Sequence, residues 1–337
     1  MRRLDFIVIG AQKCGTTALF EYLRRHPGIV VPPGKELPFY SDARVLAGGW
    51  DAYARRNFGR ADPALLWGTV TTHYMYGAPS GGERALSDPE AAAAVVPRRI
   101  HEHAPDAKLV ALLRDPVDRA FSHYRMQVLR GLERRSFEDA VAGLLEPDQL
   151  ALARLRPTGR RSYVTNGEYG RILTPYAELF RPADGLLVVF HDDLAQRPLE
   201  TLGLIFTRIG ADAGFVPPNL GRRYRDSGGL QKLAVDPGRV QRQAAGIPPL
   251  RLLWHSLPAS ARVRLLSAVE EAKYRFDLWN RTGAPPEEPG QEPLERLRRH
   301  YLADAVALER LLGVEPPWLR RWREAGSAPL PDPIPAA

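Results

Sequence analysis

Three short apolar runs, each leading into a segment with helical spacing, dominate the hydrophobic pattern of the chain. They cover residues 4–9, 108–113 and 185–190 and are rich in Leu, Ile, Val and Phe. Continuous apolar runs of this length are typical of strands buried in a parallel sheet, and residues 29–31 predict a further short strand. Because strands alternate with helices, we expect an α/β protein with one parallel sheet and helices on both of its faces.

Apolar residues three and four positions apart predict the helices. Leu19, Tyr22 and Leu23 share one face of a helix that follows the first strand. We expect a single domain over residues 1–324 and a loose Pro/Ala-rich tail at residues 325–337. Further helices are expected to begin near residue 50 and at residue 116, and to cover residues 98–104, 136–155, 198–209, 249–280 and 294–312.

Composition and charge narrow the class of protein. The chain has 337 residues, of which 44% are hydrophobic and 26% charged, as in a globular protein with a sizeable core. No apolar run reaches the ~18 residues that a membrane span needs, and the first run leads into a glycine turn, as a strand does and a signal peptide does not. We therefore expect a cytoplasmic protein. The net charge of +8 fits a bisphosphorylated nucleotide; nucleic acid is not expected, because no basic run is interleaved with aromatic residues.

A glycine-rich turn joins the first strand to its helix. Gly10 and Gly15 lie five positions apart, the spacing of a Walker A loop, and free N–H groups at the start of a helix form an anion site to which Lys13 adds a positive charge. Thr16 occupies the position of the Walker lysine, which disfavours an ordinary ATP or GTP site. A nucleotide kinase or NTPase and a turn without a ligand stay open as alternatives. Cys14 is the only cysteine; we expect a bystander whose thiol pKa is lowered by the anion loop.

The segment G-A-Q-K-C-G-T-T-A-L at residues 10–19 resembles the 5′-phosphosulfate loop of sulfotransferases that use 3′-phosphoadenosine 5′-phosphosulfate (PAPS). The similarity is greatest to the carbohydrate, heparan-sulfate-like branch and its bacterial relatives. It implies a P-loop kinase-like fold, with PAPS as donor and 3′-phosphoadenosine 5′-phosphate (PAP) as product. It also implies that Lys13 is catalytic, and that the donor is bound by Gln12, Lys13, Gly15, Thr16, Thr17 and Ala18.

A second motif follows the apolar run at residues 108–113. Arg114 stands at the end of the predicted strand, where open α/β sheets bind ligands, and Asp115 and Pro116 predict the cap and first turn of a helix. On the residues alone, Arg114 and Ser122 are a capping pair and a helical serine. The pattern R-D-P-x-x-R-A-x-S-x-Y is similar to the 3′-phosphate element of the same family, which implies that Arg114 and Ser122 bind the 3′-phosphate of PAPS.

The segment K-E-L-P-F-Y at residues 35–40 suggests the acceptor site. Taken alone, Glu36 is an exposed turn residue or a carboxylate whose pKa is raised by apolar neighbours and which serves as a base. The segment resembles the K-E-x-x-F-F element of carbohydrate sulfotransferases, which implies that Glu36 removes the acceptor proton beside Lys35. Residues 69–74, for which no strand is predicted, depart from the family pattern and make His73 an alternative base or a plain loop histidine. Tyr169 lies in a G-x-Y-x-x-x-L pattern, near the acceptor or in the core.

The resemblance implies transfer of a sulfuryl group from PAPS to a hydroxyl of a sugar, glycoside or small metabolite, without a metal ion. A basic loop containing Arg223 and Arg225 is expected to close over the nucleotide. Because residues 69–72 are altered, a non-catalytic PAPS-binding module is a further alternative. The sequence predicts neither the acceptor nor the oligomeric state.

Overall fold

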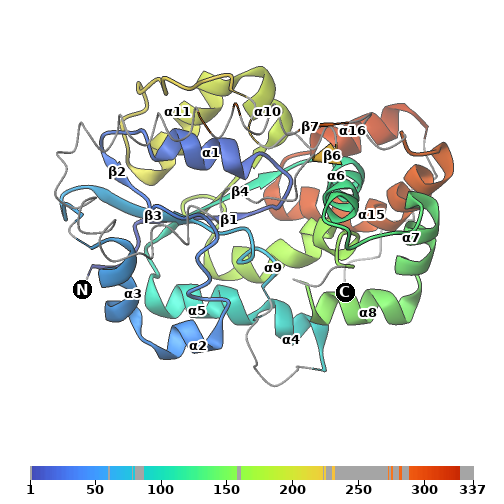
Figure 1. Ribbon diagram of the computed structural model, residues 1–337, viewed down its shortest axis with the longest axis horizontal. Coiled ribbons are helices and arrows are strands. Elements are labelled where there is room, and N and C mark those ends of the chain that lie inside the picture. Colours follow the sequence, from blue (N-terminus) through green and yellow to red (C-terminus); the bar gives the residue numbers. More distant parts are fainter. Residues whose placement is uncertain are drawn as a thin grey trace.

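A five-stranded parallel sheet forms the centre of the computed structural model (Figure 1). Its strand order is β2-β3-β1-β4-β5, and its strands are β1 (Phe6–Gly10), β2 (Ile29–Val30), β3 (Leu66–Val70), β4 (Lys108–Leu113) and β5 (Leu186–Phe190). A separate antiparallel pair joins β6 (Leu230–Gln231) to β7 (Arg281–Thr282). The structure describes residues 2–59, 61–77, 79, 87–157, 161–222, 224, 230–231, 272, 275, 281–282 and 288–326.

Strand β1 lies in the middle of the sheet and pairs with β3 on one side and β4 on the other. Phe6 is in register with Gly68 of β3 and with Lys108 of β4. Every residue of β1 is buried, as are five of the six residues of β4, which explains their continuous apolar runs. The predicted α/β fold with a single parallel sheet is confirmed.

Strand β3 is the strand of the parallel sheet that the sequence analysis missed. Gly68 and the polar Thr69 interrupt its apolar pattern. A side chain on Gly68 could not be accommodated, because a Cβ there would lie 2.1 Å from the ring of Phe6 on β1. Close packing between β1 and β3 therefore requires Gly68, and this glycine also makes the strand hard to recognise from the sequence.

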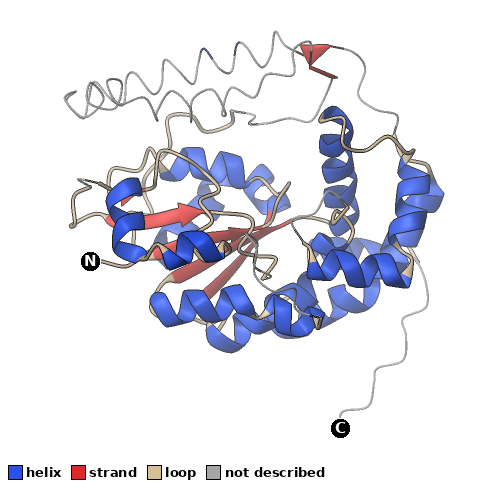
Figure 2. Ribbon diagram, turned by 60° about the horizontal axis from the view of Figure 1, so that its bottom comes forward, coloured by secondary structure: helices blue, strands red, loops and turns tan. Residues whose placement is uncertain are grey.

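Helices cover both faces of the sheet. Figure 1 shows α1, α10 and α11 on one side and α5 and α9 on the other, and Figure 2 shows the same layers after rotation. The helices are α1 (Thr16–Leu23), α2 (Ala43–Ala47), α3 (Trp50–Asn57), α4 (Pro89–Ala93), α5 (Val95–His103), α6 (Pro116–Leu129), α7 (Phe137–Leu144), α8 (Pro147–Leu155), α9 (Tyr169–Leu179), α10 (His191–Gln196), α11 (Pro198–Ile209), α15 (Gln291–Leu312) and α16 (Pro317–Glu324). Within the described residues, every helix is too short or too polar to span a membrane.

The helix expected over residues 136–155 is two helices, α7 and α8. Ser136 caps α7 as predicted, since its hydroxyl accepts from the N–H of Asp139 at 3.0 Å. Pro147 cannot continue α7, because it lacks an N–H, and instead occupies the first turn of α8. Outside the described residues lie the loop arginines 223 and 225, most of the predicted tail, and the predicted helix at residues 249–280 except for residues 272 and 275, which are helical.

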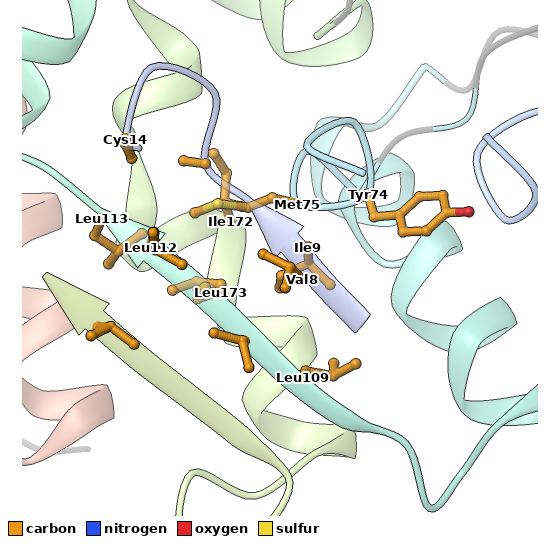
Figure 3. Close-up of a cluster of buried hydrophobic side chains, with 14 of the residues drawn as sticks. Val8, Ile9, Cys14, Tyr74, Met75, Leu109, Leu112, Leu113, Ile172 and Leu173 are labelled. Carbon is orange, nitrogen blue, oxygen red and sulfur yellow. The ribbon is translucent and has the colours of Figure 1, made fainter. Parts of the chain in front are cut away.

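The core that supports the site lies between β1, β4 and α9. Figure 3 shows Val8 and Ile9 of β1, Leu109 and Leu112 of β4, and residues of α9 meeting in one cluster, which also includes Cys14. Gly10 ends β1 against Met75, whose Sδ would lie 2.7 Å from a Cβ at Gly10. Packed core side chains thus hold the turn that follows β1 in position.

Candidate active site

Connections that follow four neighbouring strands meet at the carboxyl edge of the sheet. The N–H of Ala11 donates to the carbonyl of Leu112 at 2.7 Å, which joins the turn after β1 to β4. The N–H of Met75 donates to the carbonyl of Ile9 at 2.9 Å, which joins the segment after β3 to β1. Open α/β sheets bind their ligands at this edge, and the predicted residues Lys13, Glu36, His73 and Arg114 lie in these connections.

The turn at residues 10–15 presents the N-terminus of α1. Gly15 caps this helix in a left-handed conformation, with φ of 90°, and it has no side chain that could bind the first N–H groups of the helix. The N–H groups of the first turn, together with the helix dipole, form a site for an anion. Lys13 also has a positive φ of 73°, a conformation that costs a non-glycine residue ~1–2 kcal/mol.

Two contacts fix the predicted donor-binding residues. The hydroxyl of Tyr76 donates to Oε1 of Gln12 at 3.2 Å, and Nζ of Lys35 donates to Oγ1 of Thr16 at 3.1 Å. Thr17 and Ala18 follow on the first turn of α1 and are partly exposed. The structure therefore brings the whole predicted loop to one place.

Cys14 points into the core behind the turn. Its Sγ lies 3.7 Å from the hydroxyl of Tyr169, and its side chain is fully buried (Figure 3). Burial raises the pKa of the Cys14 thiol, and the nearby Arg119 and Arg114 lower it only in part. The expectation of a lowered thiol pKa is wrong, because the side chain packs into the core and does not face the anion site.

Arg114 lies beside this turn, close to Cys14, and Ser122 follows on α6. Arg114 directly follows β4, and its Nη2 donates to Oδ2 of Asp118 at 3.3 Å. Ser122 is partly exposed on α6, two turns into the helix. Asp115 caps α6 as predicted, since Oδ1 accepts from the N–H of Val117 at 2.9 Å. Burial raises the pKa of the Asp115 carboxyl to about 6.

The carboxylate of Glu36 lies next to the turn. Its Oε1 accepts from Nζ of Lys35 at 2.5 Å, and its Oε2 accepts from the N–H and the hydroxyl of Thr72 at 2.7 and 2.9 Å. The side chain keeps 29% of its surface exposed. Lys35 thus contacts both Glu36 and Thr16, and it joins the predicted acceptor base to the predicted donor loop.

The pKa of Glu36 is below its ordinary value, and the expected raised pKa is wrong. Burial by itself raises this pKa, but the positive charge of Lys35, the neighbouring His73 and the hydrogen bonds from Lys35 and Thr72 together lower it. Glu36 is therefore ionised at neutral pH. Its φ of 64° is positive, so within the described chain the two non-glycine residues in the left-handed region are Lys13 and Glu36. Strained conformations of this kind gather at functional sites.

The other predicted acceptor residues differ in position. His73 is partly exposed beside Glu36, with its ring 6.3 Å from that of Tyr76 between centroids. Tyr169 is 1% exposed and packs behind the turn, where its ring lies 5.8 Å from that of Trp318. This position favours core packing, which is one of the two interpretations that the sequence left open.

Several residues at the site escaped the sequence analysis. Thr72 and Tyr76 belong to the segment after β3. Because this strand was not predicted, the sequence did not indicate that the segment lies at the carboxyl edge of the sheet. His191 follows β5, and its Cδ2 would lie 3.3 Å from a Cβ at Gly15. Arg321 on α16 reaches Asp192 at 2.9 Å and, at 3.5 Å, the carboxylate that caps α6. No sequence pattern indicates a contact between segments this far apart.

The fold and this site define an α/β protein of the P-loop kinase-like class, with an anion-binding turn after β1 and an arginine after the neighbouring strand β4. The model of the Sulfotransferase family matches residues 5–213. This match covers more than half of the chain, which therefore belongs to the sulfotransferase family, near its heparan-sulfate branch. The resemblance inferred from the motifs is confirmed.

Curated relatives come from animals and an amoeba. Mouse heparan sulfate glucosamine 3-O-sulfotransferase 3B1 is 27% identical over 250 residues, which cover 73% of this chain and 51% of the relative. The membrane-associated sulfotransferase kil1 of Dictyostelium discoideum is 31% identical over 124 residues, 37% of this chain and 23% of the relative. Human bifunctional heparan sulfate N-deacetylase/N-sulfotransferase 3 is 32% identical over 147 residues, 41% of this chain and 14% of the relative. The chain thus spans about half or less of the length of these relatives.

A solved structure has the same fold. A sulfotransferase from Alicyclobacillus acidocaldarius aligns with 95% of this chain and 100% of its own length, with a TM-score of 0.59 and 22% sequence identity. The P-loop kinase-like fold inferred from the sequence is confirmed.

Proposed function

We propose that the protein transfers a sulfuryl group from PAPS to the hydroxyl of an acceptor. One observation carries this proposal: Lys35 contacts Thr16 in the turn after β1 and Glu36 in the segment after β2. A donor at the turn and an acceptor hydroxyl at Glu36 would therefore lie side by side. Family membership supports the same chemistry.

The residues at the carboxyl edge fit the charges of PAPS. The turn, with the N–H groups at the start of α1, would hold the 5′-phosphosulfate, and Gln12, Lys13 and Thr16 would contribute further donors. Arg114 and Ser122 would hold the 3′-phosphate, Arg114 by charge-assisted hydrogen bonds. PAPS, when bound, supplies the sulfuryl group, and PAP is left as the product.

Glu36 would accept the proton of the attacking hydroxyl. Its lowered pKa keeps it ionised at neutral pH, as a general base must be. Lys35 holds one carboxylate oxygen and Thr72 holds the other, so the carboxylate is positioned by two neighbours. His73, which lies beside Glu36, is the alternative base.

Stabilisation of developing charge would come from fixed donors. In-line transfer of a sulfuryl group places negative charge on the leaving phosphate oxygen, which Lys13 and the N–H groups at the start of α1 would stabilise. The strained backbone of Lys13 fits this role, since a strained conformation is kept where it positions a functional side chain.

The acceptor that we propose is a hydroxyl on a sugar, a glycoside or a small metabolite. The names of two relatives refer to heparan sulfate, which favours a sugar hydroxyl. Thr69, Val70 and Thr72 replace the usual residues of the acceptor segment, and Thr72 binds Glu36 directly. We expect the altered segment to change the choice of acceptor while keeping the base in place.

Calorimetric binding of PAP, ADP and AMP to the wild type and to Arg114→Ala tests the proposal. We expect the wild type to bind PAP more tightly than ADP or AMP. Arg114→Ala should lower the affinity for PAP about tenfold to a hundredfold, which is the usual contribution of hydrogen bonds to a charged group. AMP should be little affected, because it lacks the 3′-phosphate. Arg181→Ala is the matched control, since Arg181 is an 80% exposed arginine that precedes β5, at the opposite edge of the sheet.

Wild-type protein that binds PAP no better than ADP would contradict the donor assignment. Hydrolysis of ATP with Mg²⁺ would then support the kinase or NTPase alternative. Tight binding of PAP without sulfation of any acceptor in a panel of glycosides, sugars and phenols incubated with labelled PAPS would favour a non-catalytic PAPS-binding module.

A further inference from the structure

Arg119 is a charged side chain that the proposed mechanism does not use. It lies on α6, one turn after Arg114, and is fully buried. A guanidinium is always charged at neutral pH, and a buried charge is costly unless a group of opposite charge lies beside it. Its surroundings therefore need an explanation.

The part of the chain that the structure describes gives Arg119 only neutral partners. One terminal nitrogen lies 3.5 Å from Nδ1 of His123, and the other donates to the carbonyl of Tyr163. Burial and the charge of Arg119 hold the pKa of His123 well below its usual value, so this histidine is neutral. Nε of Arg119 has no hydrogen-bond partner, and among the described residues no carboxylate is within ion-pair distance.

The guanidinium lies behind the anion-binding turn. Tyr169, Tyr301, Tyr76 and Cys14 lie close enough to Arg119 to interact with its charge. Two of them contact the turn or belong to it, since Tyr76 donates to Gln12 and Cys14 is a turn residue whose thiol faces Tyr169. The buried guanidinium of Arg119 therefore adds positive potential to the turn from the core side.

We propose that Arg119 is a positioning residue whose charge is left without a carboxylate so that the anionic group of the donor at residues 10–15 neutralises it. The inference rests on the proposed function, because it takes the 5′-phosphosulfate of PAPS, or the 5′-phosphate of PAP, as the anion at the turn. An internal carboxylate would stabilise the unliganded protein but cancel the field at the turn. In a desolvated interior this field is screened much less than in water.

The test compares two nucleotides in two variants. PAP carries a 5′-phosphate for the turn, whereas adenosine 3′-monophosphate lacks it. We expect Arg119→Met to lower the affinity for PAP about tenfold and the affinity for adenosine 3′-monophosphate less than about twofold. Arg119→Lys keeps the charge, and its affinity for PAP should stay within about threefold of that of the wild type. Calorimetry gives the affinities, and urea unfolding without ligand reports the stability of each variant.

Equal losses for the two nucleotides would overturn the proposal, because a purely structural role weakens both alike. Loss of PAP affinity in Arg119→Lys as large as in Arg119→Met would also overturn it. If Arg119→Met does not fold, Arg119→Gln takes its place, since glutamine keeps a polar group without the charge. Failure of the wild type to bind PAP would instead remove the proposed function itself, and the two failures are therefore distinguishable.

Discussion

At the scale of single residues, Glu36 and Lys35 form a close ion pair in the candidate site. Lys35 contacts Glu36 at 2.5 Å, and its charge is the largest of the influences that lower the pKa of Glu36. A base with a low pKa is fully ionised at neutral pH but is a weaker proton acceptor. Lys35 therefore tunes the pKa of the proposed base, and an acceptor hydroxyl that enters the site would compete with Lys35 for Oε1.

Replacement of Lys35 by methionine tests this tuning. Because the positive charge is lost, the pKa of Glu36 should rise, and the acidic limb of the kcat/KM profile with PAPS and acceptor should move to higher pH. Glu36→Gln serves as the control: it should lack this limb and turn over ~10²–10⁴-fold more slowly, the usual contribution of a general base. An acidic limb that stays in place in Lys35→Met would show that the titrating group is not Glu36.

At the scale of elements, buried charges join the helices that lie beyond the carboxyl edge. Glu168, just before α9, accepts from Arg154 of α8 at 2.9 Å and from Arg171 of α9 at 2.7 Å, and lies 3.0 Å from Nε2 of His300 on α15. Burial by itself raises the pKa of Glu168, but these partners lower it to about 2. Three helices thus depend on one carboxylate.

We expect Glu168→Gln to lower the free energy of unfolding by about 2–3 kcal/mol. The loss of one partner from a fully buried ion pair costs ~3–5 kcal/mol, and the partial exposure of Arg154, at 32%, reduces this. Urea unfolding gives the value, with Glu292→Gln, an exposed residue of the same α15, as a control that should change little. Equal stability of the two variants would mean that the network does not hold the helices together.

At the scale of the whole molecule, stability should depend on pH with opposing contributions. The carboxylate of Asp304 on α15 accepts from the N–H groups of Gly170 and Arg171 at the start of α9, both at 2.8 Å. Burial nevertheless raises its pKa to about 6, so the protonated form is favoured in the fold. Glu168 has the opposite shift, and it contributes stability above its unfolded pKa that is lost as the pH falls toward 2.

Because the fold raises the pKa of Asp304, its contribution to the free energy of unfolding should decline as the pH rises from 4 to 7. A group with a raised pKa contributes stability below its unfolded pKa of 3.8 and loses it as the pH passes its folded value of about 6; this difference is worth at most about 3 kcal/mol. Asp304→Asn cannot ionise and should have a smaller slope in this range. Urea unfolding at several pH values measures it, and equal slopes for the wild type and Asp304→Asn would contradict the assignment.

The sequence by itself determined the fold class and predicted most of the candidate site. Its apolar runs predicted β1, β4 and β5, because strands buried on both faces have little polar content. The glycine turn and the Arg114 motif are local features, since each joins a strand to the helix that follows it. Both motifs could be recognised in the sequence because all residues of each motif lie within about 20 positions along the chain.

Tertiary structure decided what depends on residues far apart in the sequence. Strand β3 was hidden because Gly68 reflects contact with Phe6 and not a local preference. The pKa of Glu36 was predicted with the wrong sign because the fold brings Thr72, 36 positions away, to its carboxylate and turns the side chain of the adjacent Lys35 toward it. The neutral surroundings of Arg119 likewise exist only when α6 packs behind the turn after β1. Electrostatic interactions depend on distance in space, and only the folded chain fixes those distances.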